Sequence, residues 1–244
     1  MNSTAPKVSV ITVCRNVLQD LQVTIENVLA QQYANLEYIV IDGNSNDGSQ
    51  QLIESYSHRI AHWASEPDNG IYDAMNKGVQ ASTGEWVIFM NAGDSFAHPH
   101  VLTQIFSQEA GRHSDVIYGD VVKEINGEEV IKKAHRFKNS HRMCFCHQSA
   151  LARRALLLQY PFDTSHKLSA DFKFFKQVGL AGFRFHYAGM PVAIFDTHGV
   201  SNTSRSMGLL DNIKVIKETD SWLNQCKLLP RLYFVYGLCR LRKK

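Results

Sequence analysis

Two kinds of apolar pattern alternate through the first hundred residues, and this alternation constrains the fold more than any other feature of the chain. Short continuous apolar runs occur at Val8 to Val13, Tyr38 to Ile41 and Trp86 to Met90. Such runs are typical of strands that are buried on both faces. Between the first two runs, apolar residues from Leu18 to Leu29 recur at helical spacing. A repeated strand–helix rhythm predicts a mostly parallel sheet that is covered by helices.

The other predicted elements continue this pattern up to about residue 100, and their order becomes less regular after it. They are a helix near Leu52 to Tyr56, a strand at Ile60 to Ala64, a helix near Ile71 to Val79, a strand at Val116 to Tyr118, a hairpin that turns at Asn126 and Gly127, helices at Ser149 to Gln159 and Asp171 to Val178, a half-exposed strand around Phe183 to Tyr187, and closing helices near Met207 to Asn224 and Pro230 to Arg242. The hairpin rests on the Asn-Gly pair, a strong turn signal. No internal repeat or flexible linker is visible in the sequence, which argues against two independently moving domains.

Size and composition exclude several classes of protein. A chain of 244 residues fits one large domain or two closely joined halves. A net charge of +3 carries no nucleic-acid signal, and the five cysteines are expected to be reduced and mostly buried. The first residues do not resemble a signal peptide, and no stretch reaches the roughly 20 apolar residues of a membrane span. We therefore expect a cytoplasmic protein without a nucleic-acid partner.

Polar clusters follow three of the predicted strands. They lie at Cys14 to Asn16, at Asp42 to Gly48 and at Asn91 to Asp94. In open α/β sheets, ligands bind beyond the carboxyl ends of the strands. One polar turn after a strand is usually only a turn, but three that meet along one edge predict a ligand site.

Four segments of the chain carry recognisable motifs. They are Val8 to Val13 followed by Asn16, Tyr38 to Ser49 with its Asp-Gly-Asn-Ser-Asn-Asp-Gly turn, Ser65 to Gly78, and Gly84 to Asp94. Together they resemble the family 2 glycosyltransferases, which are inverting enzymes with the GT-A fold. The third segment is similar to a branch that builds bacterial surface polysaccharides, including colanic-acid transferases. The resemblance extends from Val8 to about Ser201.

The resemblance implies a fold and a domain plan. The fold is α/β, with a mostly parallel Rossmann-like sheet flanked by helices, a smaller mixed β region and C-terminal helices. We expect one GT-A domain over residues 1–205, with a nucleotide-sugar-binding half at 1–97 and an acceptor-binding half at 98–205. C-terminal helices follow at 206–244.

The implied activity is transfer of a sugar with inversion. The donor is a nucleotide diphosphate sugar, with a UDP-sugar as the expectation. The acceptor is a hydroxyl of a glycan or lipid-linked oligosaccharide in exopolysaccharide or lipopolysaccharide biosynthesis. The implied donor-binding residues are Asn16, Asp42, Asp68, Asn69, Asp73 and Asn91. Asp42 either accepts a hydrogen bond from a base N–H or caps its own turn, and both interpretations stay open.

Asp94 is the candidate ligand of a divalent cation, Mn²⁺ or Mg²⁺. Such a cation favours carboxylate and phosphate oxygens and neutralises the charge that develops on the leaving diphosphate. The turn here reads Asn91, Ala92, Gly93, Asp94, whereas the usual family motif has several acids. We therefore expect the cation to be held mainly through the phosphates of the donor. Because this turn contains one acidic residue, a non-catalytic nucleotide-sugar-binding module derived from the same fold also stays open.

Asp171 matches the position of the catalytic base in the family's Glu-Asp motif, with Ala170 in place of the Glu. An inverting enzyme needs a carboxylate or a histidine to take the proton of the acceptor hydroxyl. A helix start favours an ionised carboxylate. The alternative interpretation of Asp171 is an ordinary helix N-cap.

Three further residues are assigned to the acceptor side by the resemblance: His147, Gln148 and His198. A structural hydrogen-bonding role for His147 and Gln148 stays open. His198 replaces a glycine of the branch pattern, and a late histidine ligates the metal in some GT-A enzymes. The basic stretch from Lys132 to Arg142 either faces an acceptor pyrophosphate or is solvated loop charge.

The C-terminal segment from Leu228 to Tyr236 is apolar and aromatic, and Arg240, Arg242, Lys243 and Lys244 follow it. This pattern fits a helix on an anionic membrane surface, which predicts peripheral attachment at the inner face of the membrane. A helix packed on the domain with a solvated basic tail is the alternative. A nucleotidyltransferase is disfavoured, because the first strand is not followed by a glycine-rich phosphate loop.

Overall fold

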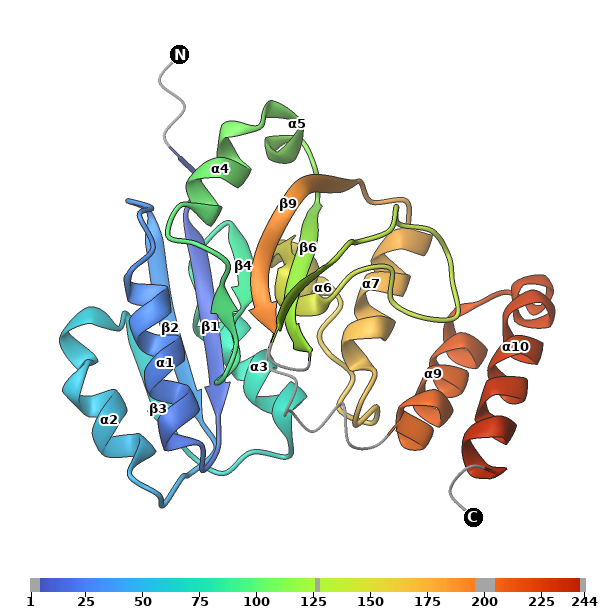
Figure 1. Cartoon of the computed structure of the whole chain (residues 1–244), viewed down its shortest axis with the longest axis horizontal. Helices are drawn as coiled ribbons and strands as arrows, with labels where there is room; N and C mark the ends of the chain where they lie inside the picture. Colours follow the sequence, from blue (N-terminus) through green and yellow to red (C-terminus); the bar gives the residue numbers. More distant parts are fainter. Residues whose placement is uncertain (1–4, 126–127, 196–204, 242–244) are drawn as a thin grey trace.

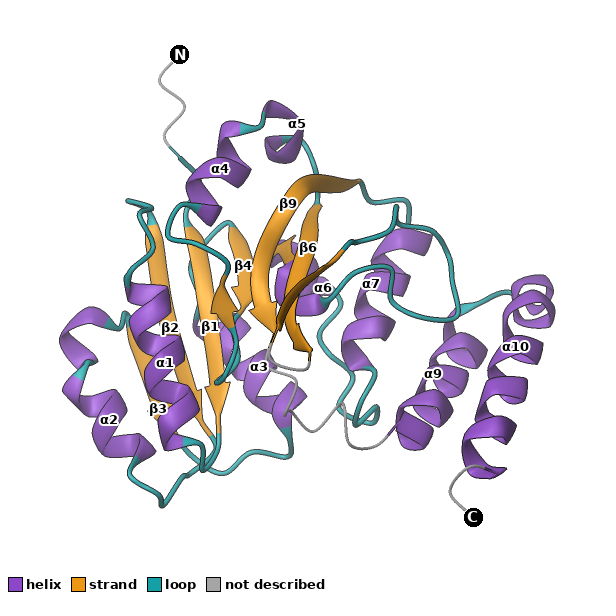
Figure 2. Ribbon diagram, in the orientation of Figure 1, coloured by secondary structure: helices purple, strands orange, loops and turns teal. Residues whose placement is uncertain are grey.

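A computed structural model describes residues 5–125, 128–195 and 205–241. The described strands form one nine-stranded sheet with the order β3-β2-β1-β4-β8-β6-β9-β5, and β7 pairs with β6 beside this path. Helices cover both faces of the sheet, and a helix pair stands at one end of the molecule (Figures 1 and 2). The predicted α/β fold is confirmed.

The first half of the sheet is parallel, as predicted. Its strands are β1 (Val8–Cys14), β2 (Leu36–Asp42), β3 (His62–Ser65) and β4 (Trp86–Phe89). Between them lie α1 (Leu18–Leu29), α2 (Ser49–Ser55), the 3₁₀ turn η1 (Ser57–Arg59) and α3 (Ile71–Ala81). The strand register pairs Cys14 with Asp42 and Asp42 with Ser65. The carboxyl ends of these strands therefore meet at one edge.

The second half of the sheet is mixed. Its elements are β5 (Ser95–Phe96), α4 (Val101–Ser107), α5 (Glu109–Arg112), β6 (Val116–Ile125), β7 (Glu128–Lys132), the 3₁₀ turn η2 (His147–Ser149), β8 (Ala150–Arg153), α6 (Arg154–Gln159), α7 (Ala170–Leu180) and β9 (Phe185–Phe195). Strand β8 is antiparallel to β4 and β6, whereas β9 is parallel to β6. The antiparallel pairing of β6 with β7 confirms the predicted hairpin.

The helix predicted from Ser149 to Gln159 is wrong in its first half. Residues 150–153 form strand β8, and only residues 154–159 are helical. Ala152 is paired with Val87 of β4 on one side and with Val116 of β6 on the other. A short apolar run is ambiguous between helix and strand, and here the two neighbouring strands decide the outcome.

The closing helices are α9 (Arg205–Thr219) and α10 (Trp222–Leu241). The predicted start of the last helix at Pro230 is wrong, because Pro230 lies inside α10. The break between the helices falls at Asp220 instead, whose side chain is buried. Among the described helices, none is both long enough and apolar enough to cross a membrane.

Both faces of the sheet are buried, which explains the continuous apolar strands. In β1, Val8 and Val10 belong to the core on the α1 and α4 side, and Ile11 and Val13 belong to the core on the α3 and α7 side. Successive side chains of a strand point to opposite faces, so a strand covered on both faces is mostly apolar, and the buried Ser9 and Thr12 of β1 have hydrogen-bond partners. The first half thus forms a rigid base for the loops at its carboxyl edge.

The helix pair α9–α10 stands beside α7 (Figure 1), and charged side chains fasten it there. Lys176 of α7 is only 3% exposed, and its ammonium lies 2.8 Å from the Asp220 carboxylate. Asn139 donates to Asp220 at 2.6 Å and also accepts from Lys176. Nearby, His166 lies between Asp211 and Glu218 of α9, at 2.8 and 2.9 Å. The helix that carries Asp171 is therefore held from its outer side by the buried Lys176–Asp220 ion pair.

Replacing Asp220 by Ala should lower the free energy of unfolding by about 3–5 kcal/mol, because it leaves the Lys176 ammonium buried without its charged partner. Chemical denaturation measures this loss. Adding Lys176→Met to that variant should restore much of the stability. Glu54→Ala, at an exposed position of α2, serves as the control and should change stability by less than about 0.5 kcal/mol. A small effect of Asp220→Ala, similar to that of the control, would contradict the fastening role.

Candidate active site

The loops after β1, β2 and β4 converge at the carboxyl edge of the parallel strands, as the sequence predicted. The Gly43 amide donates to the Cys14 carbonyl at 2.9 Å, and the Ala92 amide donates to the Val13 carbonyl at 3.3 Å. These contacts continue the strand pairing into the loops. The three polar clusters therefore occupy one edge, where a ligand of an open α/β sheet binds.

Asp42 ends β2 and has no exposed surface. Its carboxylate accepts hydrogen bonds from the Ser45 amide at 2.9 Å and the Ser65 hydroxyl at 2.6 Å, and also from the Ser45 hydroxyl. Asp42 thus caps its own turn and ties it to the end of β3. Contact with a nucleotide base stays a prediction.

Asn16 and Asp47 join the first two loops. Asn16 has a positive φ of 53°, a conformation that asparagine tolerates better than most residues. Its amide donates to the Ser45 hydroxyl at 2.7 Å, and its side-chain oxygen accepts from the Asn46 amide at 2.9 Å. Asp47 accepts from the Leu18 amide at the start of α1 at 2.9 Å. Donor contact by Asn16 stays a prediction, whereas its role in shaping the loops is observed.

Asp68, Asn69 and Asp73 lie at the start of α3. Asp68 accepts from the Gly70 amide at 2.9 Å, and Asp73 accepts from the Asn69 amide at 2.9 Å. The Asp68 carboxylate also lies against Gly43, where an added Cβ would collide with it. The predicted donor-binding residues after β2 and after β3 are therefore neighbours. Each of these contacts orients the loop backbone, and their contact with a donor stays a prediction.

The turn from Asn91 to Asp94 is held against α1 by Thr24. The Thr24 hydroxyl donates to the Asp94 carbonyl at 2.8 Å and accepts from the Gly93 amide at 2.9 Å. Gly93 has a φ of 97°, which favours glycine. Sequence reasoning missed Thr24, because a polar residue on an amphipathic helix gives no sign of what it contacts. The one sign of its role in the sequence is that Thr24 lies on the apolar face of the α1 helix, which the structure buries.

Asp171 is brought together with His147 and Tyr72. Its carboxylate accepts from the Tyr72 hydroxyl at 2.9 Å and lies 3.1 Å from Nδ1 of His147. These residues come from α7, η2 and α3, so the fold assembles them from distant parts of the chain. The N-cap of α7 is Ser169, and Asp171 lies in the first turn. The interpretation of Asp171 as the N-cap is therefore wrong.

The three groups perturb one another's protonation. Burial raises the pKa of Asp171, but the hydrogen bonds from His147 and Tyr72 outweigh it and lower the pKa overall. Burial lowers the pKa of His147, but the bond to Asp171 and the charges of Asp171 and Asp94 outweigh it and raise the pKa. Burial and the Asp171 charge raise the pKa of Tyr72 well above its usual range. At neutral pH, Asp171 is ionised and Tyr72 is a neutral donor.

The charge of Asp94 contributes to the raised pKa of His147, after the larger effect of Asp171. Gln148 is buried and accepts from the Cys146 thiol at 2.8 Å. Contact of His147 or Gln148 with an acceptor stays a prediction. His198 lies outside the described residues, so its predicted role is not tested.

The Asn91 turn fits a hard cation better than a second candidate cluster does. Asn91 Oδ1 is buried and has no hydrogen-bond partner among the residues that the structure describes, and the Asp94 carboxylate belongs to the same turn. Oxygen atoms of this kind are the ligands that Mg²⁺ and Mn²⁺ prefer. The second cluster, Asp163, His166 and Glu218, has metal-ligand spacing. The Lys173 ammonium already lies 2.6 Å and 2.5 Å from its two carboxylates, so that cluster is satisfied without a metal.

The Asp171–His147 pair should make stability depend on pH. The pKa of His147 is raised on folding, so its contribution is full below the unfolded value of 6.5 and is lost as the pH rises through the folded value. We expect His147→Gln to lower the melting temperature more at pH 6 than at pH 9. Thermal denaturation at both pH values measures this, with His58→Gln at an exposed position as the control. An equal loss at both pH values would contradict the charged pair.

Comparison with known proteins agrees with this architecture. The chain is 27% identical over 176 residues to the PGL/p-HBAD biosynthesis glycosyltransferase of Mycobacterium bovis (strain BCG / Pasteur 1173P2), which covers 70% of this chain and 68% of the relative. It is 40% identical over 111 residues to an uncharacterised glycosyltransferase of Mycobacterium tuberculosis (strain CDC 1551 / Oshkosh), which covers 45% of this chain. The chain spans only 42% of the length of that second relative.

Solved structures share the fold at low sequence identity. S. aureus TarS 1-349 in complex with UDP-GlcNAc superimposes with a TM-score of 0.69 at 18% identity, covering 88% of this chain and 68% of that one. The mannosyltransferase PcManGT of Pyrobaculum calidifontis, in complex with GDP-Man and Mn²⁺, gives 0.70 at 16% identity, covering 90% and 66%. The expected GT-A fold is thus confirmed.

The model of one protein family, described as glycosyl transferase family 2, matches residues 9–185. This range includes the three loops at the carboxyl edge, the Asn91 turn and the Asp171–His147–Tyr72 group. It makes up more than half of the chain. The protein therefore belongs to glycosyl transferase family 2.

Proposed function

We propose that the protein transfers a sugar, with inversion, from a nucleotide diphosphate sugar to a hydroxyl of a glycan or lipid-linked oligosaccharide in surface polysaccharide biosynthesis. The observation that carries the proposal is the Asp171 carboxylate, which His147 and Tyr72 hold in place from two other elements of the fold. Solved structures of similar fold bind UDP-GlcNAc and GDP-Man. A UDP-sugar is the expected donor for this chain, and both this expectation and the polysaccharide branch rest on the sequence resemblance.

The donor lies across the carboxyl edge of β1, β2 and β4 in this proposal. Asn16 and Asp42 lie at its base end, and Asp68, Asn69 and Asp73 lie beside the nucleotide or the sugar. Asn91 and Asp94 would hold a divalent cation, Mn²⁺ or Mg²⁺. When bound, the cation neutralises charge on the leaving group. The already ordered loop backbone lowers the conformational entropy lost on binding.

Asp171 takes the proton of the acceptor hydroxyl. Its lowered pKa keeps it ionised, as a general base must be, and two donors fix the orientation of its oxygens. A carboxylate is a weak base towards a free alcohol, so the proton moves as the new C–O bond forms and the hydroxyl becomes acidic. His147 and Tyr72 act as positioning residues for this step. Gln148 and His198 remain candidates for contact with the acceptor.

Replacing Asp171 by Asn should preserve donor binding and lower turnover by about 10²-fold or more, the scale of general-base catalysis. The amide keeps the shape of the side chain but cannot accept the proton. Donor affinity by calorimetry and release of nucleoside diphosphate in the presence of acceptor measure the two effects separately. Glu109→Gln, at an exposed position of α5, is the matched control. Unchanged turnover in Asp171→Asn would remove Asp171 from the mechanism.

A second candidate is a non-catalytic nucleotide-sugar-binding module. The observation that favours it is the thinned motif, in which Asp94 is the one carboxylate of the Asn91 turn. The Asp171–His147–Tyr72 group argues against it, because donor binding alone gives no reason for a partly buried carboxylate that two neighbouring side chains orient at this place. Tight donor binding with no transfer to any acceptor would favour the module.

Peripheral attachment to the inner face of the cell membrane is part of the proposal. Helix α10 exposes large apolar side chains, with Trp222 74% and Phe234 68% exposed. It also carries Lys227, Arg231 and Arg240, and residues 221–244 contain no Asp or Glu. Apolar and cationic side chains on one helix are typical of binding to an anionic membrane surface. Attachment there would bring the site to a lipid-linked acceptor.

A further inference from the structure

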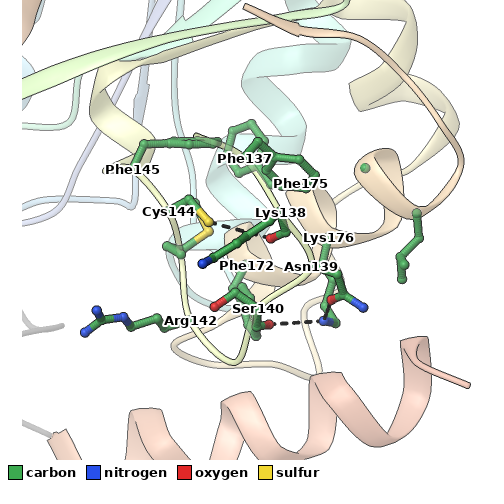
Figure 3. Close-up of a pocket in the computed structure, with 13 residues that line it drawn as sticks. Phe137, Lys138, Asn139, Ser140, Arg142, Cys144, Phe145, Phe172, Phe175 and Lys176 are labelled. Atoms are coloured by element: carbon green, nitrogen blue, oxygen red, sulfur yellow. Dashed lines mark hydrogen bonds between the residues drawn. The ribbon is translucent and has the colours of Figure 1, made fainter. Parts of the chain in front are cut away.

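A hollow lies between helix α7 and the loop of residues 133–146, here named the basic loop (Figure 3). The loop closes on itself, because the His135 amide donates to the Cys144 carbonyl at 2.8 Å. Phe137 anchors the loop on α7 at Gly179, where an added Cβ would collide with the ring. The hollow is therefore formed by an anchored loop and not by a loose segment.

Aromatic side chains form the wall of the hollow. Phe137, Phe145, Phe172 and Phe175 line it, and Phe145 meets Phe175 edge to face with ring centroids 4.9 Å apart. Leu180 also lines it and is 44% exposed. Figure 3 shows Phe137, Phe145 and Phe175 grouped together, with Arg142 projecting away from them. Such a surface suits an apolar chain.

Cations line the same hollow. Lys138 and Arg142 are exposed, and neither forms an ion pair within the described part of the chain. Lys176 is buried and is already neutralised by Asp220. The residues that line the hollow include no Asp or Glu. The lining thus carries two positive charges beside an apolar wall.

The protonation of His141 reports the same positive charge. Burial lowers its pKa, and the charges of Arg231, Arg142 and Lys176 lower it further. These cations come from α10, the basic loop and α7, so three elements contribute positive charge around His141. An anion at this position would be stabilised by Arg142 and Arg231, whereas the charge of Lys176 is already paired with Asp220.

The hollow adjoins the candidate active site on one side. Phe172 follows Asp171 directly on α7, and Phe145 precedes His147 by two residues. Phe175 lines this hollow and also a smaller one that contains His147.

On the other side the hollow adjoins α10. Leu232 of α10 packs in one cluster with Phe172 and Met143, and the neighbouring Phe234 is exposed. The hollow therefore lies between the site of the proposed transfer and the proposed membrane-binding helix.

We propose that this hollow binds the phosphate-bearing end of a lipid-linked acceptor, that is, a phosphate or diphosphate joined to an apolar chain. Arg142 and Lys138 bind the anionic group, and the aromatic wall holds the first part of the apolar chain. The sugar of the acceptor then extends towards Asp171. The inference rests on the proposed function, because it presumes that Asp171 serves an acceptor hydroxyl.

Farnesyl diphosphate is a soluble probe with this chemistry. It would be titrated into the full chain by calorimetry, without nucleotide. The double variant Lys138→Gln/Arg142→Gln should bind it about tenfold more weakly or worse, because charge-assisted hydrogen bonds are lost. Leu180→Glu should weaken binding similarly, because it adds a negative charge at the hollow. Lys214→Gln, at an exposed position of α9, is the matched control and should bind as the wild type does.

Several outcomes would overturn the inference. Inorganic pyrophosphate binding as tightly as farnesyl diphosphate would show that the apolar wall is not used. Displacement of the probe by UDP or GDP would place it in the donor site. Loss of binding to phosphatidylglycerol vesicles in the double variant, with farnesyl diphosphate binding unchanged, would assign the cations to membrane headgroups. Unchanged probe affinity in the double variant, in which both replaced side chains are exposed, would also contradict it.

A donor measurement on the same preparation separates the two proposals. A nucleotide sugar that stabilises the protein, without binding of farnesyl diphosphate, would defeat the inference alone. Binding of farnesyl diphosphate that depends on Arg142 and Lys138, without stabilisation by any nucleotide sugar, would defeat the proposed function instead.

Discussion

The buried carboxylate of Asp42 is the interaction on which the ligand edge of this protein depends. A carboxylate with no exposed surface is costly unless donors satisfy it, and here Ser45 and Ser65 supply them. Because Ser65 ends β3 and Ser45 belongs to the turn after β2, one charge holds two loops in register. Asp47 extends the same arrangement to the start of α1. The polar loops are ordered before any ligand arrives, which is the preorganisation that a binding site needs.

Buried charges have a comparable role on the opposite side of the active site. Helix α7 carries Asp171 in its first turn, and its residues Lys173 and Lys176 pair with Glu218 and Asp220 at the end of α9. The C-terminal helices are thereby linked to the position of the proposed base. The same helices border the hollow that we assign to the lipid-linked end of the acceptor.

Sequence patterns were sufficient for most of the first half of the fold because β1, β2 and β4 are buried on both faces and α1 and α3 are amphipathic. The ligand edge followed from the polar turns after Val13, Ile41 and Met90, because carboxyl ends of parallel strands must meet. Strand β8 was missed, since its pairing partners lie more than 30 residues away and periodicity cannot reveal them. The division at residues 97 and 205 stays a prediction.

The sequence identified most residues of the candidate site but did not predict which of them contact one another. The family motif led to Asp171, but no local pattern shows that Tyr72, 99 residues earlier, donates to it. His147 was nominated for the acceptor side, yet its observed partner is Asp171. Thr24 and Ser65 were missed, because single hydroxyl residues give no signal until the loops are packed. What the sequence lacks in each case is the long-range contact that satisfies a buried polar group.

The central claim is that this protein binds a nucleotide sugar at the carboxyl edge and transfers its sugar. A panel of nucleotide sugars, each with and without Mn²⁺ or Mg²⁺, tests it most directly by thermal shift and by release of nucleoside diphosphate. The account predicts metal-dependent stabilisation by one donor, with slow release of its nucleoside diphosphate. At about 100 times its Kd, that donor should stabilise the protein by about 2.7 kcal/mol, or roughly 5–10 °C. No stabilisation by any donor, with or without metal, would contradict the account.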